Sequence, residues 1–201
     1  GRHCILCAQV GVSGSTALTK TGNGTLALSG TNTYAGGTTV TGGLVEFTTL
    51  GNFGSGTVTL DGGGLRWATG ATTDPSARLA ALGAGGAPFD THGNNVTFAT
   101  ALTGSSAVTK TGAGALTVAS PAALGTGALA ITGGTLQGSA DFIADRAVTI
   151  AGAGATLASV GYTEFGHNAN GSLALSGGGA VTSGSSVAFG VLGGVTGTGS
   201  V

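Results

Sequence analysis

The stretch LTKTGNGTLALSG, from Leu18 to Gly30, decides the fold, because most of it returns later in the chain. VTKTGAGALTV, from Val108 to Val118, repeats its first eleven residues at an offset of 90. NGSLALSG, from Asn170 to Gly177, repeats its last eight residues with a single change. Internal repeats of this kind indicate a stack of similar structural units.

A second repeated stretch shows how large one unit is. GSGTVTLDGGGL, from Gly54 to Leu65, returns as GTGALAITGGTL, from Gly125 to Leu136, at an offset of 71. The two offsets differ by 19 residues, and the extra block in the first half contains NTYAGGTTVTGGLVEF, from Asn32 to Phe47. A solenoid tolerates the loss of a whole coil because each coil contacts only its neighbours. We therefore interpret about 20 residues as one coil.

Each coil contains short segments in which Leu, Val or Ile alternates with Thr, Ala or Ser, separated by glycines. Alternation places one set of side chains inward and the other outward, as in a β-strand. The sequence therefore predicts an all-β fold, a right-handed parallel β-helix (β-solenoid), which we expect to be a fragment of a longer rod. The predicted inward residues are Leu26, Leu28, Val58, Leu60, Leu116, Val118, Leu129, Ile131, Leu173 and Leu175.

The composition excludes several other classes of protein. Glycine supplies 43 of the 201 residues, charged residues make up 6%, and the net charge is −1. A nucleic-acid-binding surface needs clustered Lys and Arg, so we expect no nucleic-acid partner. Collagen is excluded because glycine does not occupy every third position. The sequence has no run of 18 apolar residues that would form a membrane-spanning helix.

Few side chains suggest a metal or redox site. The sequence HCILC gives His3, Cys4 and Cys7, which are three of the four ligands that structural zinc prefers. A redox Cys-x-x-Cys pair is expected near a strand–helix unit, which is missing here. We interpret this stretch as an N-terminal remnant, and we predict neither a metal site nor a cofactor.

Catalytic groups are also sparse. The neighbouring acid–histidine pairs, Asp90 with His92 and Glu164 with His167, are best explained as polar loop residues at coil corners. Lys20 and Lys110 occupy the same position of the repeat, which favours a structural turn feature over catalysis. Polysaccharide-degrading sites need several acidic or basic groups converging on one groove, so we predict no catalytic residues and no enzyme.

With these motifs, the chain resembles the passenger region of bacterial autotransporters. The passenger-associated transport repeat, or autotransporter-associated β-strand repeat, has the form LTKxGxGTLTLSGxNTYxGGTxVxxGxL, and Leu18 to Val45 follows it closely. The second copy keeps VTKTGAGALTV but lacks the NTYxGGT part after Val118. The resemblance implies type V secretion, an extracellular or cell-surface location at the outer membrane, and a C-terminal β-barrel translocator in the parent polypeptide that is absent from this chain.

The expected organisation has two parts. Residues 1–14 are predicted to be an N-terminal remnant, disordered or non-native, and residues 15–201 a passenger β-helix. Repeats are expected near 18–47, 108–136 and 170–201. The non-repeating stretch from Ala71 to Phe89 is the candidate for an insertion loop.

Three functions are compatible with this organisation. The first is a structural segment that supports export and folding at the outer membrane and displays the passenger. The second is an adhesin surface that binds host glycans or proteins. The third, a polysaccharide-degrading β-helix enzyme, is remote because no carboxylate cluster is evident.

Overall fold

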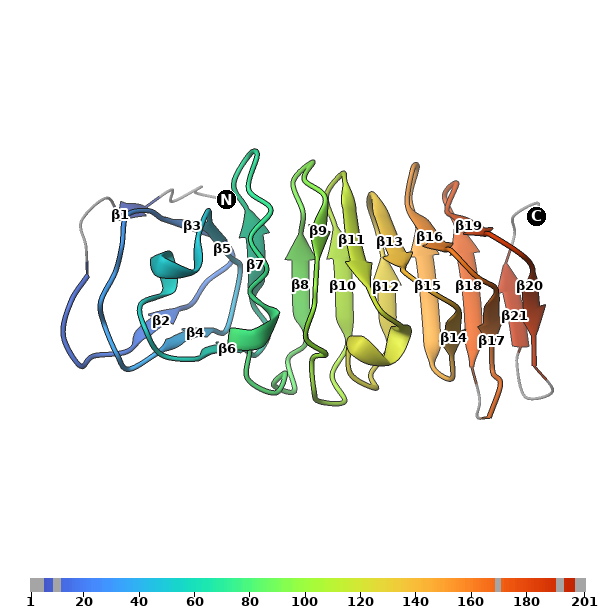
Figure 1. Ribbon diagram of the computed structural model, residues 1–201, viewed down its shortest axis with the longest axis horizontal. Coiled ribbons are helices and arrows are strands. Elements are labelled where there is room, and N and C mark those ends of the chain that lie inside the picture. Colours follow the sequence, from blue (N-terminus) through green and yellow to red (C-terminus); the bar gives the residue numbers. More distant parts are fainter. Residues whose placement is uncertain (1–5, 9–11, 169–170, 191–193, 198–201) are drawn as a thin grey trace.

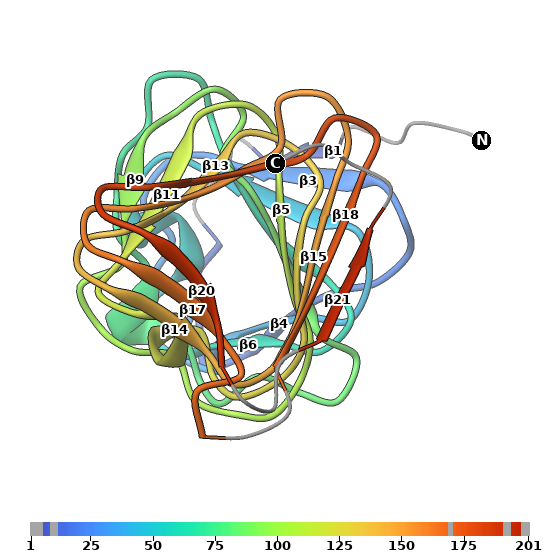
Figure 2. The same cartoon turned by 90° about the vertical axis from the view of Figure 1, so that its right-hand side faces the viewer.

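The computed structural model describes residues 6–8, 12–168, 171–190 and 194–197. The chain winds into a parallel β-solenoid of about 8 turns, with the first strands at one end of the rod and the last strands at the other (Figure 1). In Figure 2 the chain advances toward the viewer and runs counterclockwise from β13 through β14 to β15. The predicted right-handed parallel β-helix is therefore confirmed.

One long sheet runs along the whole rod, and three shorter sheets form the other faces. The long sheet has ten strands: β1 (Leu6–Ala8), β3 (Thr25–Leu28), β5 (Leu44–Phe47), β7 (Gly64–Trp67), β8 (Ala87–Asp90), β10 (Val108–Thr111), β12 (Leu129–Ile131), β15 (Ala147–Ala151), β18 (Ser172–Ser176) and β21 (Gly194–Gly197). The five-stranded sheet contains β9 (Val96–Thr97), β11 (Ala115–Val118), β13 (Thr135–Gly138), β16 (Thr156–Ser159) and β19 (Ala180–Ser183).

The two smaller sheets have three strands each. One consists of β2 (Leu18–Lys20), β4 (Thr38–Val40) and β6 (Val58–Leu60), near the N-terminal end. The other consists of β14 (Phe142–Ala144), β17 (Thr163–Phe165) and β20 (Val187–Phe189), near the C-terminal end. Short 3₁₀ turns form some corners: η1 (Leu50–Phe53), η2 (Ser76–Arg78) and η3 (Pro121–Ala123).

The core is a continuous column of apolar side chains inside the coils. Nine of the ten predicted inward residues are buried, and Leu175 is partly buried against the same core. Aromatic rings stack through the middle of the rod, where Trp67 lies 5.2 Å from Phe47 and 6.0 Å from Phe98 between ring centroids. Among the phenylalanines, Phe189 is the exposed exception.

The two main repeats occupy different faces of the solenoid. In the first copy, LTK forms β2 in a small sheet and TLAL forms β3 in the long sheet. In the second copy, VTKT forms β10 in the long sheet and ALTV forms β11 in the five-stranded sheet. The repeat has therefore moved round the rod by one face between its two copies.

This shift takes place between β7 and β8, which we call the seam. Leu65 of β7 pairs with Phe89 of β8, and Arg66 pairs with Asp90. The stretch from Ala71 to Phe89, expected as an insertion loop, lies within the coil that spans the seam: it contains η2 and an isolated bridge from Leu79 to Val58.

Part of the expected N-terminal remnant lies in the long sheet. Leu6–Ala8 form β1, which is parallel to β3 and pairs Leu6 with Leu26. The edge of β3 exposes backbone donors and acceptors that an added strand satisfies. Residues 1–5 and 9–11, including Cys4, lie outside the described residues, as do 169–170, 191–193 and 198–201 in and beside the third expected repeat. Within the described part of the chain, no helix is long and apolar enough to span a membrane.

Candidate functional site

Lys20 closes a corner between two successive coils. Its side chain is buried, and its Nζ donates hydrogen bonds to the carbonyl oxygens of Thr21 (2.8 Å) and Gly22 (2.7 Å) in its own coil. The third bond runs to the carbonyl oxygen of Gly42 (2.8 Å) in the following coil. An ammonium group has three donors, so this corner uses all of them.

Lys110 forms the same corner in the second repeat. Its side chain is completely buried, and its Nζ donates to the carbonyl oxygens of Thr111 (2.8 Å) and Gly112 (2.8 Å). The third acceptor is the carbonyl oxygen of Gly133 (3.0 Å), again one coil further on. We call these two arrangements the lysine corners. The sequence indicated a turn feature at these positions, and the structure shows its geometry.

Glycine makes room for each lysine corner. Gly43 and Gly134 have φ of +63° and +61°, in the left-handed region that favours glycine. A Cβ atom at Gly43 would overlap the carbonyl oxygen of Gly24, and one at Gly134 would overlap that of Gly114. The same atoms would lie 2.7 Å from Lys20 Nζ and 2.9 Å from Lys110 Nζ, respectively. The lysine of one coil and the glycine pair of the next therefore form one structural unit.

Burial alters the ionisation of both lysines. It lowers the pKa of Lys20 and lowers the pKa of Lys110 to about 8, because the charged form loses hydration. The nearby Asp90 carboxylate opposes the decrease in the pKa of Lys110. Both amines are engaged by backbone carbonyls, which suits them to a structural role.

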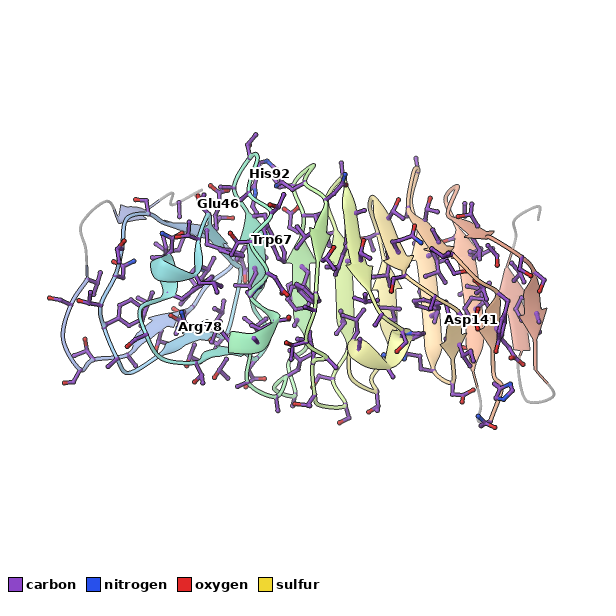
Figure 3. The ribbon with its side chains drawn as sticks, in the orientation of Figure 1. Glu46, Trp67, Arg78, His92 and Asp141 are labelled. Carbon is purple, nitrogen blue, oxygen red and sulfur yellow. The ribbon has the colours of Figure 1, made fainter. Side chains whose placement is uncertain are left out.

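Arginine side chains close other corners in the same way, by donating hydrogen bonds to several backbone carbonyls. Arg78, at the end of η2, donates from Nη1 to the carbonyl oxygens of Leu50 (3.0 Å) and Gly54 (2.9 Å) in the preceding coil. Its Nη2 donates to the carbonyl oxygen of Gly56. In Figure 3 Arg78 lies beside η2, on the side of the N-terminal coils.

Arg146 forms the same arrangement. Each of its three acceptors lies 71 residues after the corresponding acceptor of Arg78. Its guanidinium donates to the carbonyl oxygens of Pro121 (2.7 Å), Gly125 (2.5 Å) and Gly127 (3.1 Å). Burial lowers the pKa of Arg146, because the cation loses hydration. The second repeated stretch of the sequence thus supplies two of the three carbonyl acceptors for an arginine of the next coil.

The NTY stretch of the first repeat also joins coils. Asn32 is buried, and its amide nitrogen donates to the carbonyl oxygen of Asn52 (2.7 Å) while its amide oxygen accepts from Val12 N (2.7 Å). Tyr34 is buried, and its hydroxyl lies 2.5 Å from Thr38 Oγ1. Burial raises the pKa of Tyr34, an effect that the Thr38 hydrogen bond and the Arg78 charge oppose.

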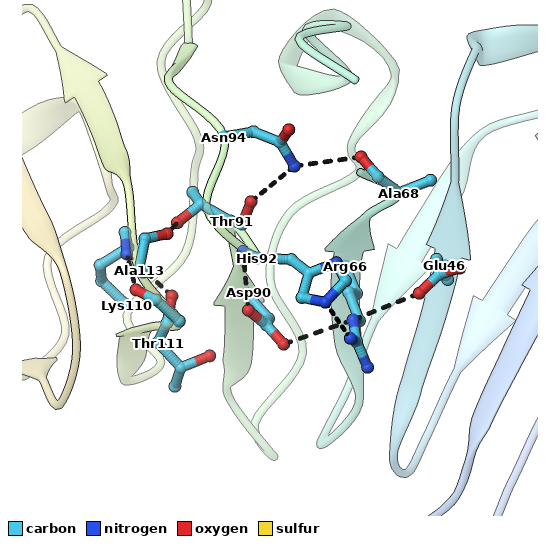
Figure 4. A network of polar contacts seen from close by, with 11 residues as sticks. Glu46, Arg66, Ala68, Asp90, Thr91, His92, Asn94, Lys110, Thr111 and Ala113 are labelled. Carbon is cyan, nitrogen blue, oxygen red and sulfur yellow. Dashed lines mark hydrogen bonds and ion pairs between the residues drawn. The ribbon is translucent and has the colours of Figure 1, made fainter. Parts of the chain in front are cut away.

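Four side chains form a charge cluster on the outer face of the long sheet (Figure 4). Arg66 Nε lies 3.2 Å from Glu46 Oε2 and 3.7 Å from Asp90 Oδ2. Arg66 Nη2 also contacts His92 Nε2, and His92 N donates to Asp90 Oδ1 (2.9 Å). We call Glu46, Arg66, Asp90 and His92 the charge cluster. Sequence analysis paired Asp90 with His92 but missed Arg66 and Glu46, which lie on other coils.

The second acid–histidine pair is separate from this cluster. Glu164 Oε2 lies 2.8 Å from His167 Nδ1 at a corner beside β17, and the His167 side chain is 47% exposed. Among the described residues, no group of three or more His, Cys, Asp or Glu side chains is arranged to hold a metal ion. Cys4 and His3 lie outside the described residues.

Comparison with known protein families identifies the two stretches that contain the lysine corners. The model of the passenger-associated transport repeat matches residues 18–46 and 108–137, each of which contains one lysine corner and its glycine pair. The chain therefore carries two passenger-associated transport repeats. The third expected repeat, near 170–201, is not among the matched residues.

A relative supports the same assignment. The Adhesin BmaC autotransporter of Brucella suis biovar 1 (strain 1330) is 34% identical over 142 residues, which cover 66% of this chain and 4% of the relative. The chain therefore spans a small part of that protein's length. No solved structure matches the chain significantly. The two matched repeats and the parallel β-solenoid fit a passenger β-helix.

Proposed function

We propose that this segment is a structural part of an autotransporter passenger, which supports export and folding at the outer membrane and displays the rest of the passenger. The lysine corners carry this proposal, because each one is complete only when the next coil has docked. Folding coil by coil gives the exported chain a direction, since every new coil satisfies groups left open by its neighbour. The arginine corners act in the same way between other coils.

The proposed setting follows from the repeat family. The passenger would lie outside the cell or on its surface, attached to the outer membrane through a C-terminal translocator of the same parent polypeptide. The low content of charged residues, 6%, suits a chain that crosses a membrane unfolded and then folds into uncharged, stackable coils.

Surface display of the parent protein tests the proposal. Gly134→Ala is introduced into the parent, and Gly154→Ala serves as the matched control, because Gly154 has φ of +77° but open space around it. We expect Gly134→Ala to reduce the protease-accessible passenger on intact cells, with the precursor retained in the envelope, and Gly154→Ala to leave display near the wild-type level. Equal display of the two variants, despite a measured loss of stability in Gly134→Ala, would contradict a role in export.

Adhesion is the second candidate, because the relative is named an adhesin. Host glycans or proteins are the proposed ligands, and the charge cluster offers charged and polar side chains on an outer face of the solenoid. Binding of the chain to a glycan array, compared with that of Arg66→Met, tests this function. Loss of specific binding in the variant would support adhesion through this patch, and the absence of binding by the wild-type chain would count against it.

An enzymatic function is disfavoured. The matched family is a structural repeat and the relative is named an adhesin. The acidic and basic side chains of the charge cluster are paired with one another on an outer sheet face. A polysaccharide-degrading activity therefore remains a remote alternative.

A further inference from the structure

The seam between β7 and β8 is built differently from its neighbouring strand pairs. Two register pairs join β7 to β8, whereas four join β5 to β7 and four join β8 to β10. β8 contains Pro88, which has no backbone N–H to donate to the ladder. A Cβ atom at Gly64 would overlap the carbonyl oxygen of Pro88, so the two strands approach closely at this point.

The charge cluster spans this seam. Arg66 stands on β7, Asp90 ends β8, and His92 follows in the next corner, whereas Glu46 lies on β5 (Figure 4). His92 has φ of +50° and is the one non-glycine residue with positive φ among those described. A backbone conformation of this kind persists only where surrounding contacts maintain it.

The contact between Arg66 and His92 assigns a hydrogen-bonding role to each nitrogen of the imidazole. A guanidinium only donates hydrogen bonds, so His92 Nε2 must accept from Arg66 Nη2. The ring is then neutral, with its proton on Nδ1, and Nδ1 is buried without a hydrogen-bond partner. A second proton would place an N–H of the imidazolium directly against the guanidinium.

We propose that His92 is an acid-sensitive latch on the seam. At neutral pH the imidazole accepts from Arg66 and holds the corner after β8 against β7. Imidazole side chains titrate between about pH 5 and pH 8, whereas carboxylates titrate lower. Protonation therefore turns an attractive contact into a repulsion between two cations across the seam.

The other charged groups near His92 do not replace this contact. Asp90 and Glu46 are already paired with Arg66, and Asp90 also accepts from His92 N. Lys110, on the adjacent β10, directs its Nζ toward the carbonyl oxygens of its own corner. Acid is thus expected to loosen β7 from β8 while the lysine corners on both sides remain closed.

Hydrogen exchange on the full chain, followed by mass spectrometry, tests the latch. Protection factors, corrected for intrinsic exchange rates, are compared at about pH 7.5 and about pH 5. We expect protection in peptides covering β7 and β8 to fall at least about fivefold in acid, while peptides covering β12 and β13 stay unchanged. A uniform decrease along the rod, or no decrease at the seam, would overturn the proposal.

Three variants identify the titrating group. In His92→Asn, which adopts positive φ more readily than most residues, the acid effect should disappear. It should also disappear in Arg66→Met, which removes the cation that the imidazolium meets. His167→Asn is the matched control and should retain the full effect. Persistence of the effect in both His92→Asn and Arg66→Met, or its loss in His167→Asn, would reject His92 as the latch.

Discussion

Lys20 Nζ lies 2.8 Å from the carbonyl oxygen of Gly42, a residue of the following coil, and this bond joins two coils through a buried cation. Lys110 and Gly133 repeat the relationship at 3.0 Å in the second copy of the motif. Three backbone carbonyls converge on each amine, so the LTKTG stretch of one coil and the TGG stretch of the next are interdependent.

Removing the Lys110 amine should destabilise the rod. Lys110→Met keeps the length of the side chain but leaves three carbonyl groups without their donor. We expect the free energy of unfolding to fall by about 3 kcal/mol. Urea denaturation measures this loss, with Thr109→Ala, which faces outward on the same strand, as the control that should change stability by less than about 0.5 kcal/mol. Equal effects of the two substitutions would contradict the role assigned to the amine.

The second glycine of each glycine pair should also be sensitive to substitution. Gly134→Ala adds a Cβ that overlaps Gly114 O and approaches Lys110 Nζ, in addition to straining φ. Gly154→Ala carries a similar φ strain with no neighbour within 4 Å. We expect a loss of about 1 kcal/mol in Gly154→Ala and at least about 3 kcal/mol in Gly134→Ala. Losses of the same size in the two variants would show that backbone strain alone explains why glycine is required at position 134.

Stability should increase with pH above about pH 8. The pKa of Lys110 is about 8 in the folded chain, below its ordinary value of 10.5, so the unfolded chain binds more protons between these values. Linkage then makes folding more favourable as pH rises through this range. Above about pH 10 the raised pKa of Tyr34 acts in the opposite direction, because the unfolded phenol ionises first.

Urea denaturation between about pH 8 and pH 9.5 isolates the lysine effect. We expect the increase to be present in the wild-type chain and largely removed in Lys110→Met. An increase of the same size in that variant would assign the effect to other groups.

The arginine corners should contribute independently of the lysine corners. Arg146→Met leaves the carbonyl oxygens of Pro121, Gly125 and Gly127 without their shared donor. We expect a loss of about 2–4 kcal/mol, measured by thermal or urea unfolding. Thr126→Ala, at an exposed position of the same corner, is the control and should stay within about 0.5 kcal/mol of the wild type. If Arg146→Met left the free energy of unfolding unchanged, the arginine corner would have no stabilising role.

Much of the fold could be predicted from the sequence, because alternation and repetition are local signals. The predicted inward positions are buried from Leu26 to Leu173, and only the last of them, Leu175, is partly covered. The shift of the repeat by one face could not be predicted, because LTKTG and VTKTG have the same pattern on either face. It depends on pairing between β7 and β8, which no repeat offset records.

The site was predicted less completely. The shared position of Lys20 and Lys110 indicated a turn feature, but the acceptors on the next coil depend on coil stacking. Likewise, Asp90 and His92 are neighbours in sequence, whereas Arg66 and Glu46 join them only through the register of parallel strands. A signal that finds such contacts is the coil length, since residues about 20 apart face one another across coils.

A double-mutant cycle on Lys110 and Gly134 tests the central claim, that a lysine of one coil and the glycines of the next form one unit. The free energy of unfolding is measured for the wild type, Lys110→Met, Gly134→Ala and the double variant. Once the amine is absent, the carbonyls around Gly134 are free to shift. The double variant should therefore be more stable than the sum of the single losses predicts, by about 1 kcal/mol or more. Additive losses, within about 0.5 kcal/mol, would contradict the claim.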